Sequence, residues 1–393
     1  MKPCFILSAV RTPIGRLAGA YANVPTVELG GIVIREAVNR AGIDVGKLDE
    51  VLMGNVLQGG EGQAPARQAA IRGGVPAGVG ATTVNKVCGS ALKAIMQGAQ
   101  GIALDDASLI VAGGMESMTL APYFIQGARQ GLRLGHTQML DAVVHDGLWC
   151  SFENFHMGNA AEFIAREFEI TREEQDEYAL RSHRRAVAAW NTGKFNAETV
   201  PVTLPAKKGA PVIVKQDESP RADTSLEALS KLPPVFQKDG TVTAGNAPGI
   251  TDGAAAVVLS SEEACDATSI DPLARITGYA QAAVEPKWIF DAPSHAVRRL
   301  LQKTNTTIDD YDLIEVNEAF AAQILANGHA LNWDWERVNV NGGSIALGHP
   351  LGATGARIVV TLLHALKERG GKRGLACLCL GGGEAVAMSF EMV

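Results

Sequence analysis

The chain has 393 residues, a formal net charge of -7 and an apolar fraction of 47%. That length is too great for a single hydrophobic core, so we expect two or three domains. The acidic balance argues against a general nucleic-acid-binding protein, because such proteins present a dominant basic face. No run reaches the ~18 apolar residues of a membrane span, and the first apolar run is too short for a signal peptide. We therefore expect a cytoplasmic protein with neither nucleic acid nor membrane as a partner.

Apolar runs and helical spacings alternate along the chain, which predicts an α/β fold whose helices cover mainly parallel strands. Short apolar runs that end in glycine at 108–114 and 374–383 are typical of buried strands. The helices predicted from apolar periodicity span residues 27–41, 90–103, 294–302 and 353–368.

An order of strand, loop, helix, strand and double glycine occurs twice, in residues 82–118 and again in 338–390. Two similar α/β halves packed on one another would explain this repeat, with buried and unusually apolar helices between them. Residues 121–249 contain charged helical segments and few strand signals, so we expect an inserted loop domain there. The predicted division is 1–120 plus 250–270, 121–249, and 271–393.

Six cysteines are scattered without the spacing of a disulfide framework, so we expect mostly free thiols. The pair Cys377 and Cys379 alternates along one predicted strand, and Cys379 comes just before a glycine turn. Zinc motifs usually space their ligands by two to four residues, and no matching histidine pair exists, so we expect no metal.

Cys88, in "NKVCGSALKA", lies where a predicted strand ends and a helix begins. A thiol at a helix N-terminus faces unpaired amides and the positive end of the helix dipole, which favours the thiolate. The same amides could hold an oxyanion. A small buried cysteine at the end of a strand is an equally good interpretation of this stretch alone.

Two further polar residues follow strand signals. His349 lies among the five glycines of "GGSIALGHPLGATGAR", and Asn317 follows the apolar run "LIEV". Taken singly, they could be a structural histidine and a helix cap. The loop does not have the Gly-Lys-Ser/Thr ending of a phosphate-binding P-loop. The combination of two cysteines, a histidine and an asparagine at strand-to-loop junctions favours catalysis.

With these motifs in this order, the chain resembles the thiolase family over essentially its whole length. The segments "NKVCGSALKA", "EVNEAFAAQ", "NVNGGSIALGHPLGATGAR" and "CLCLGGG" resemble that family's active-site segments. The segments "TVTAGNAPGITDGAAA" and "FHMGNAAEFIA" resemble its coenzyme A-binding parts. The resemblance implies a thiolase-like fold, with two similar α/β halves in a layered α-β-α-β-α arrangement and an inserted loop domain.

The resemblance also implies a reversible Claisen condensation of two acyl-CoA thioesters, with these thioesters as substrates and no cofactor. Cys88 would be the nucleophile, and His349 would take its proton and then donate to the thioester oxygen. Cys379 would act as general acid and base on the second substrate. His349 and a water held by Asn317 would form one oxyanion hole, and the amides of Cys88 and Gly381 a second. The glycines around His349 would let the thioester lie against the backbone.

For coenzyme A, the resemblance implies that Arg221 contacts the nucleotide. Pro248, in "GNAPG", departs from the family's common pattern because it removes a hydroxyl that could bind the pantetheine. Trp288, Ile289 and Phe290 replace smaller or more flexible residues, so the acyl-chain preference stays open. The positions matched to the substrate channel are Leu148, His156, Met157, Phe236, Ala244, Ala247, Pro248, Ile289 and Phe320.

Three activities fit these residues. A bulky pocket wall favours transfer of an acetyl group between two acetyl-CoA molecules. The alternatives are a degradative 3-ketoacyl-CoA thiolase of broader chain length and, more remotely, a non-catalytic acyl-CoA-binding scaffold. Residues 127–149 resemble the tetramer-forming loop of short-chain biosynthetic members, which implies a homotetramer built as a dimer of dimers.

Overall fold

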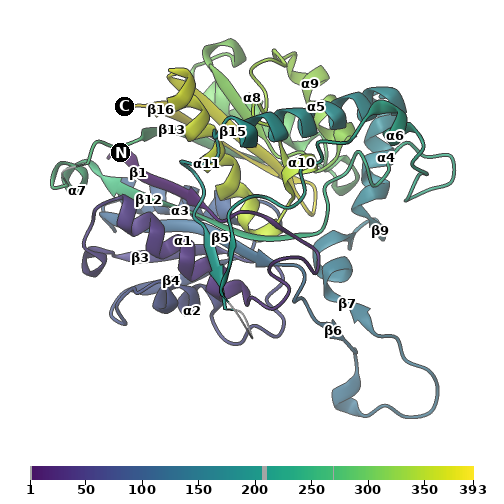
Figure 1. The fold of residues 1–393 in the computed structure, drawn as a ribbon, viewed down its shortest axis with the longest axis horizontal. Coiled ribbons are helices and arrows are strands. Elements are labelled where there is room, and N and C mark those ends of the chain that lie inside the picture. Colours follow the sequence, from purple (N-terminus) through teal and green to yellow (C-terminus); the bar gives the residue numbers. More distant parts are fainter. Residues whose placement is uncertain (1, 206–209, 269) are drawn as a thin grey trace.

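The computed structural model describes residues 2–205, 210–268 and 270–393, and Figure 1 shows two strand-rich halves with helices between and around them. The first half contributes to the large sheet the strands β1 (Cys4–Arg11), β2 (Gly15–Arg16), β3 (Glu50–Gly54), β4 (Gly80–Val84), β5 (Leu109–Ser117) and β12 (Thr251–Ser261). The second half contributes β13 (Ala274–Ala283), β14 (Leu313–Val316), β15 (Arg373–Leu380) and β16 (Glu384–Met392).

The described chain also contains helices and three small sheets of short strands. The helices are α1 (Thr26–Arg40), α2 (Pro65–Arg72), α3 (Ser90–Ala103), α4 (Met157–Glu167), α5 (Arg172–Asn191), α6 (Leu226–Ser230), α7 (Glu262–Asp266), α8 (Ala292–Thr304), α9 (Ala321–Leu331), α10 (Ser344–Leu347) and α11 (Leu351–Arg369). Three small sheets pair β6 (Tyr123–Phe124) with β7 (Leu140–Asp141), β8 (Trp149–Cys150) with β9 (Phe155–His156), and β10 (Val202–Leu204) with β11 (Val212–Val214).

The strands of the large sheet follow the order β14-β15-β16-β13-β1-β12-β5-β3-β4, with β2 paired to β12. Three pairs are parallel, namely β3 with β4, β3 with β5, and β14 with β15, whereas the other pairs are antiparallel. The expectation of mainly parallel strands is therefore wrong. One cause is the short turn between Leu380 and Glu384, which leaves no room for the crossover that parallel neighbours require.

The layers follow the expected α-β-α-β-α order. Helices α1 and α2 pack on the strands of the first half, and α8 and α9 pack on those of the second. Between the halves, α3 and α11 share one apolar core with strands of both. Fifteen of the nineteen residues of α11 are buried, as expected for a helix enclosed between two layers.

The predicted helices form, with small differences at their ends. Helix α3 has the predicted bounds, Ser90–Ala103. Helix α8 begins at Ala292 rather than residue 294, because Pro293 is tolerated in a first helical turn, where its missing N–H costs no hydrogen bond. None of the described helices combines the length and the apolar character needed to cross a membrane.

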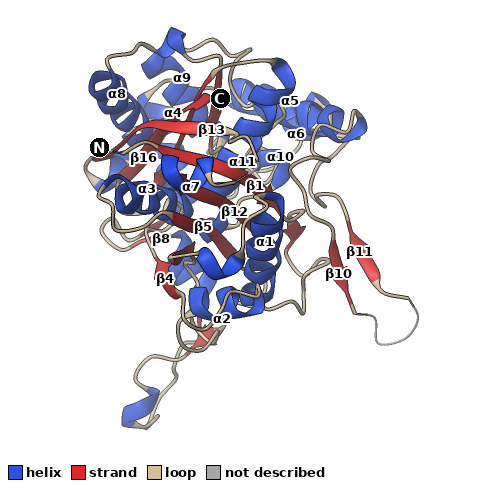
Figure 2. Cartoon of the chain, turned by 90° about the vertical axis from the view of Figure 1, so that its left-hand side faces the viewer, coloured by secondary structure: helices blue, strands red, loops and turns tan. Residues whose placement is uncertain are grey.

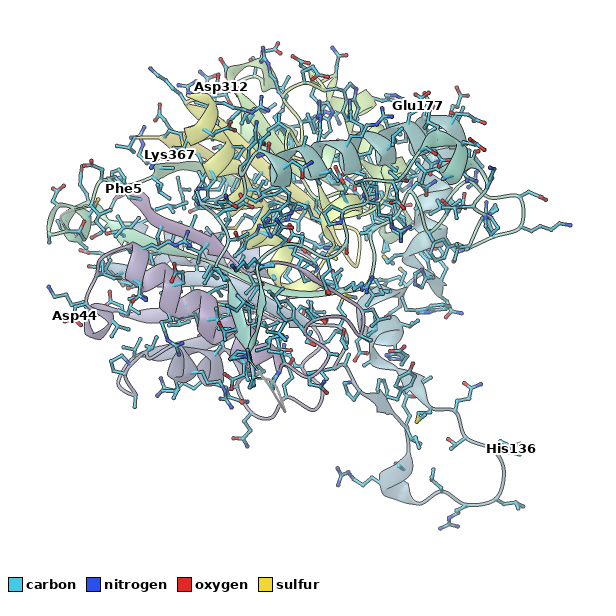
Figure 3. The ribbon with its side chains drawn as sticks, viewed as in Figure 1. Phe5, Asp44, His136, Glu177, Asp312 and Lys367 are labelled. Atoms are coloured by element: carbon cyan, nitrogen blue, oxygen red, sulfur yellow. The ribbon has the colours of Figure 1, made fainter. Side chains whose placement is uncertain are left out.

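Residues 121–249 lie between β5 and β12 and carry helices α4 to α6 together with the three small sheets. Figure 2 shows the β10–β11 hairpin extending from the body. A second arm, residues 125–139, extends between β6 and β7, and Figure 3 shows His136 on it, away from the body. The insertion is tied to β1 by the buried Arg11, which pairs with Glu198 at 2.5 Å and with Asp217 at 2.7 Å.

We expect Gly114→Ala to destabilise the protein, because α11 approaches β5 closely at this position. An added Cβ would lie 1.9 Å from the carbonyl oxygen of Gly352 and 2.8 Å from the Cβ of Ala91. Overpacking of this kind typically costs about 1–3 kcal/mol, and backbone atoms cannot move aside easily. Thermal unfolding should show a clearly lower Tm. Gly78→Ala is the matched control, since nothing lies within 4 Å of its Cβ position. Equal Tm values for the two variants would contradict this close packing.

Candidate active site

The turn before α3 presents Cys88. Val87 has a φ of 45°, a left-handed conformation that is rare for a β-branched residue. Such a conformation costs on the order of 1–3 kcal/mol and persists only where the surroundings enforce it. Ser90 supplies that restraint, because its hydroxyl accepts from the Lys86 amide at 2.9 Å and donates to the Val87 carbonyl at 2.6 Å. The strained turn directs the Cys88 side chain to the end of the sheet.

Cys88, His349, Cys379 and Gly381 line one cavity of about 370 Å³. The walls of the cavity are predominantly apolar. Eight of the nine residues matched to the substrate channel line it too: Leu148, His156, Met157, Phe236, Ala247, Pro248, Ile289 and Phe320. The cavity lining also includes residues that sequence reasoning did not single out, among them Met118, Val143, Gly147 and Leu351. Val143 and Gly147 belong to a single π-helical turn, Val143–Leu148, a form often found at functional sites.

Arg221 and Ala244 lie in a second cavity of about 630 Å³. Ala247, Gly249 and Ile250 line both cavities, so the two are neighbours along one wall. Arg16 and Arg221 give the second cavity positive charge, although Glu218 and Asp223 also line it. An anionic ligand would find cations there despite the acidic balance of the whole chain.

His183 is a further residue of the second cavity that sequence reasoning missed. Its Nδ1 accepts from the Arg221 backbone amide at 3.2 Å, which anchors the loop that carries this arginine. Burial and the neighbouring Arg221 charge lower the pKa of His183 to about 4. His183 is therefore neutral near pH 7 and acts here as an acceptor.

Both cavity thiols are neutral in the ligand-free protein. Burial raises the pKa of Cys88 to about 12, although the backbone amides of Cys88 and Gly381 act in the opposite direction. Burial and the neighbouring Cys88 and Cys377 raise the pKa of Cys379 well above its ordinary value. The expectation that the helix N-terminus favours a Cys88 thiolate is thus wrong for the ligand-free protein, because desolvation outweighs the amides. Ionisation must be coupled to a base.

His349 can serve as that base, because its hydrogen bonds define the tautomer. Thr354 donates its hydroxyl proton to the Pro350 carbonyl at 2.8 Å, so its oxygen must accept from Nδ1–H of His349 at 2.6 Å. The other nitrogen, Nε2, therefore carries no proton, and its lone pair faces Nδ2 of Asn317 at 3.4 Å. Burial, with the positive charge of Arg357, lowers the pKa of His349 to about 3, which keeps the ring neutral.

Asn317 lies behind His349, at the end of β14. Its backbone amide donates to the Cys377 carbonyl at 3.1 Å, and the side chain is fully buried. The next residue, Glu318, anchors this loop by accepting hydrogen bonds from four groups. The donors are the Tyr178 hydroxyl, the Ser182 hydroxyl, the Asn339 side-chain amide and the Ile345 backbone amide.

Cys379 lies at the end of β15, before a turn in which Gly382 and Gly383 have φ values of 89° and 84°. Positive φ is accessible to glycine at little cost, so the chain can reverse into β16 directly after the thiol. Lys86 forms an ion pair with Glu384 and so joins the loop of Cys88 to the loop of Cys379. The described residues contain no group of His, Cys, Asp or Glu side chains that could hold a metal ion.

The five glycines around His349 face protein atoms. A Cβ at any of them would lie between 2.3 and 2.7 Å from another part of the chain. The expectation that these glycines let a thioester lie against the backbone is therefore wrong. They allow neighbouring segments to pack closely, and Gly348, with a φ of 115°, also needs the conformational freedom of glycine. The five are Gly342, Gly343, Gly348, Gly352 and Gly355.

The wall beside Cys379 is rigid and aromatic. Ile289 and Phe290 are buried, and the rings of Phe290 and Phe320 meet edge to face at 5.4 Å. The carbonyl of Phe290 accepts from the Asn327 side chain at 2.8 Å. Trp288 packs its ring edge to face against Phe163. Among the described residues, Trp288 is not one of those that line the cavity.

Comparison with known proteins identifies the class of enzyme. Residues 4–263 match the thiolase N-terminal domain, and residues 270–392 match the thiolase C-terminal domain. The chain therefore belongs to the thiolase family, whose members are acyltransferases.

Relatives of high similarity cover the whole chain. An acetyl-CoA acetyltransferase of Escherichia coli K12 is 53% identical over 392 residues, covering 100% of this chain and 99% of the relative. An acetyl-CoA acetyltransferase of Pseudomonas aeruginosa is 52% identical over 390 residues, covering 99% of both chains. The crystal structure of the Bacillus anthracis acetyl-CoA acetyltransferase superimposes with a TM-score of 0.98 at 45% identity, covering 100% of this chain and 99% of that one.

We expect alkylation of Cys88 by iodoacetamide in the ligand-free protein to accelerate with pH from about pH 7 to about pH 10 without levelling off. Below its pKa, the thiolate fraction of a cysteine rises about tenfold per pH unit, and the pKa of Cys88 is raised to about 12. Mass spectrometry of the peptide that contains Cys88 measures the rate separately from the other thiols. A plateau beginning near neutral pH would instead indicate a preformed thiolate.

Proposed function

We propose that the protein is an acetyl-CoA C-acetyltransferase, which condenses two acetyl-CoA molecules to acetoacetyl-CoA and free CoA in a reversible reaction. The observation that carries this proposal is the cavity in which Cys88, His349 and Cys379 meet beside a rigid wall of Ile289 and Phe290. The names of the full-length relatives support it as well.

In the first half-reaction, Cys88 attacks the thioester carbonyl of acetyl-CoA while its proton moves to Nε2 of His349. The C–S bond to CoA breaks, and the leaving thiolate takes the proton of Cys379. Free CoA departs and leaves acetyl-Cys88, a His349 imidazolium and a Cys379 thiolate. This order suits a resting site whose two thiols and imidazole are all neutral.

In the second half-reaction, the Cys379 thiolate removes an α-proton from a second acetyl-CoA. The resulting carbanion attacks the carbonyl of acetyl-Cys88, and Cys88 leaves as a thiolate that recovers its proton from His349. Before that transfer, Nε2–H of the imidazolium donates a hydrogen bond to the enolate oxygen, and a water held by Asn317 donates a second. The amides of Cys88 and Gly381 stabilise the oxyanion formed on the acetyl carbonyl. All three residues return to their resting state.

Coenzyme A would extend from this site past Ala247 into the second cavity. The pantetheine part would lie beside the stacked rings of His156 and Phe236, whose centroids are 4.8 Å apart. Arg221 would contact the phosphorylated nucleotide there. Pro248 offers no hydroxyl, so the pantetheine would be held at this point by shape and by backbone groups.

Thiolysis of acetoacetyl-CoA and of 3-ketooctanoyl-CoA, measured side by side, tests the substrate. We expect a preference for acetoacetyl-CoA of at least about tenfold in kcat/KM, since the buried wall leaves little room for a longer chain. Comparable rates would move the assignment to a 3-ketoacyl-CoA thiolase of broader chain length. Inactivity on both substrates would favour an acyl-CoA-binding scaffold. Cys88→Ala should abolish turnover, and unchanged turnover would exclude the acyl-cysteine intermediate.

We also propose that the protein is a homotetramer, a dimer of dimers, assembled through the arm of residues 125–139. Leu132, Leu134 and Met139 are exposed on this arm, which is unusual for large apolar side chains grouped on one projecting segment. A second arm, from another copy of the chain, would cover them.

The triple variant Leu132→Ser, Leu134→Ser, Met139→Ser should therefore change the mass in solution from four chains to two. Light scattering coupled to size-exclusion chromatography measures this mass. Leu104→Ser is a suitable control, because Leu104 is also exposed but lies outside the arm, after α3. A triple variant that keeps the wild-type mass would rule out assembly through the arm.

A further inference from the structure

A row of buried polar groups continues behind Asn317, away from the cavity. The Ser344 hydroxyl lies 2.6 Å from Oδ1 of Asn317, and a guanidinium nitrogen of Arg357 lies 2.9 Å from the same hydroxyl. Arg357 also pairs with Glu315 at 2.8 Å. All four side chains are at most 2% exposed. A buried charge in such a place is costly, so its retention calls for a reason beyond packing.

The groups at the two ends of this row determine which atom donates and which accepts in each of its hydrogen bonds. Arg357 can only donate, so the Ser344 oxygen must accept from it. The single proton of Ser344 is then available only for Asn317, which makes the atom facing Ser344 the amide oxygen. The amide nitrogen of Asn317 must therefore face Nε2 of His349. At the far end, the Pro350 carbonyl can only accept. The Thr354 hydroxyl therefore donates to this carbonyl and accepts from Nδ1–H of His349.

We propose that Ser344 and Arg357 are positioning residues, which hold the Asn317 amide so that its nitrogen, not its oxygen, faces Nε2 of His349. This inference rests on the proposed function, because it concerns the base of that reaction. With the amide in this orientation, Nε2 faces a donor and stays unprotonated, so it can take the proton of Cys88. The Asn317 nitrogen also stays on the side of the imidazole and can share in the first oxyanion hole.

A flipped Asn317 would present its oxygen to Nε2. That oxygen favours a proton on Nε2 and so opposes the tautomer that Thr354 favours, because the two neutral tautomers are close in free energy and their hydrogen bonds decide between them. Nε2 could then not accept the proton of Cys88. Ser344 and Arg357 thus act on His349 through the orientation of one amide, without contacting the substrate.

A double-mutant cycle on Ser344→Ala and Asn317→Ala tests this role in acetoacetyl-CoA thiolysis. Ser344→Ala should lower kcat by about 10- to 100-fold, with KM changed by less than about twofold, as expected for a support that does not touch the substrate. In the Asn317→Ala background, removing the Ser344 hydroxyl should have no further effect on kcat. Such complete non-additivity is the signature of one residue acting through another.

Thr361→Val is the matched control, since it removes a buried hydroxyl from α11, the helix that carries Arg357, and this hydroxyl donates to Glu198, which is not part of the row. Its kcat should equal that of the wild type. If Ser344→Ala shows no cooperative unfolding transition, Arg357→Lys takes its place in the same cycle. The shorter lysine keeps a positive charge beside Glu315 but cannot also donate to the Ser344 hydroxyl.

Additive losses of kcat in either cycle would overturn the positioning role, as would a Ser344→Ala variant with wild-type kcat. An inactive wild-type protein would instead overturn the proposed function, so the two failures are distinguishable.

Discussion

The close contact of α3 with α11 determines the geometry of the site. A Cβ on Gly355 of α11 would lie 2.3 Å from the backbone nitrogen of Leu92 in α3, so the two helices touch backbone to backbone. Helix α3 begins two residues after Cys88, and α11 begins two residues after His349. Packing these two N-terminal turns together therefore brings a thiol from one half of the fold to an imidazole from the other. The distance between the halves at this point is set by glycines.

Burial between the two halves also determines the protonation states of the side chains in the cavity. Burial makes the thiols and the imidazole neutral at rest, so the site holds no catalytic charge before a thioester enters. The same apolar surroundings strengthen any hydrogen bond to an oxyanion that forms later, because the effective dielectric constant is low. The buried side chains of Arg357 and Glu315 lie behind the imidazole and are paired with each other. Charge in the cavity is thus generated by the reaction and removed by it.

Local patterns in the sequence were sufficient to predict much of the fold. The bounds of α3 follow from apolar periodicity, and the internal repeat indicates two similar halves with buried helices between them. The order of the layers was implied by the resemblance to the thiolase family. Strand direction does not follow from such patterns, since β12 pairs antiparallel with β1 and β5 only after a long insertion returns the chain to the sheet. The residues of the cavity were largely identifiable from four motifs. Their protonation was not, because the groups that act on the pKa of Cys88 include segments more than two hundred residues away, such as the backbone amide of Gly381.

The segment from Gly342 to Arg357 shows why one imidazole is placed among so many glycines. Its glycines let α11 and its preceding loop contact β12, α3 and α5 closely, and Gly348 delivers the His349 amide to the Thr251 hydroxyl at 2.8 Å. Three of its polar residues, Ser344, Thr354 and Arg357, then determine which nitrogen of the ring carries the proton. The segment thus supplies the base, the rigid support for its backbone and the control of its tautomer. A reactive nitrogen in an apolar cavity needs all three, because its lone pair would otherwise be lost to the wrong tautomer.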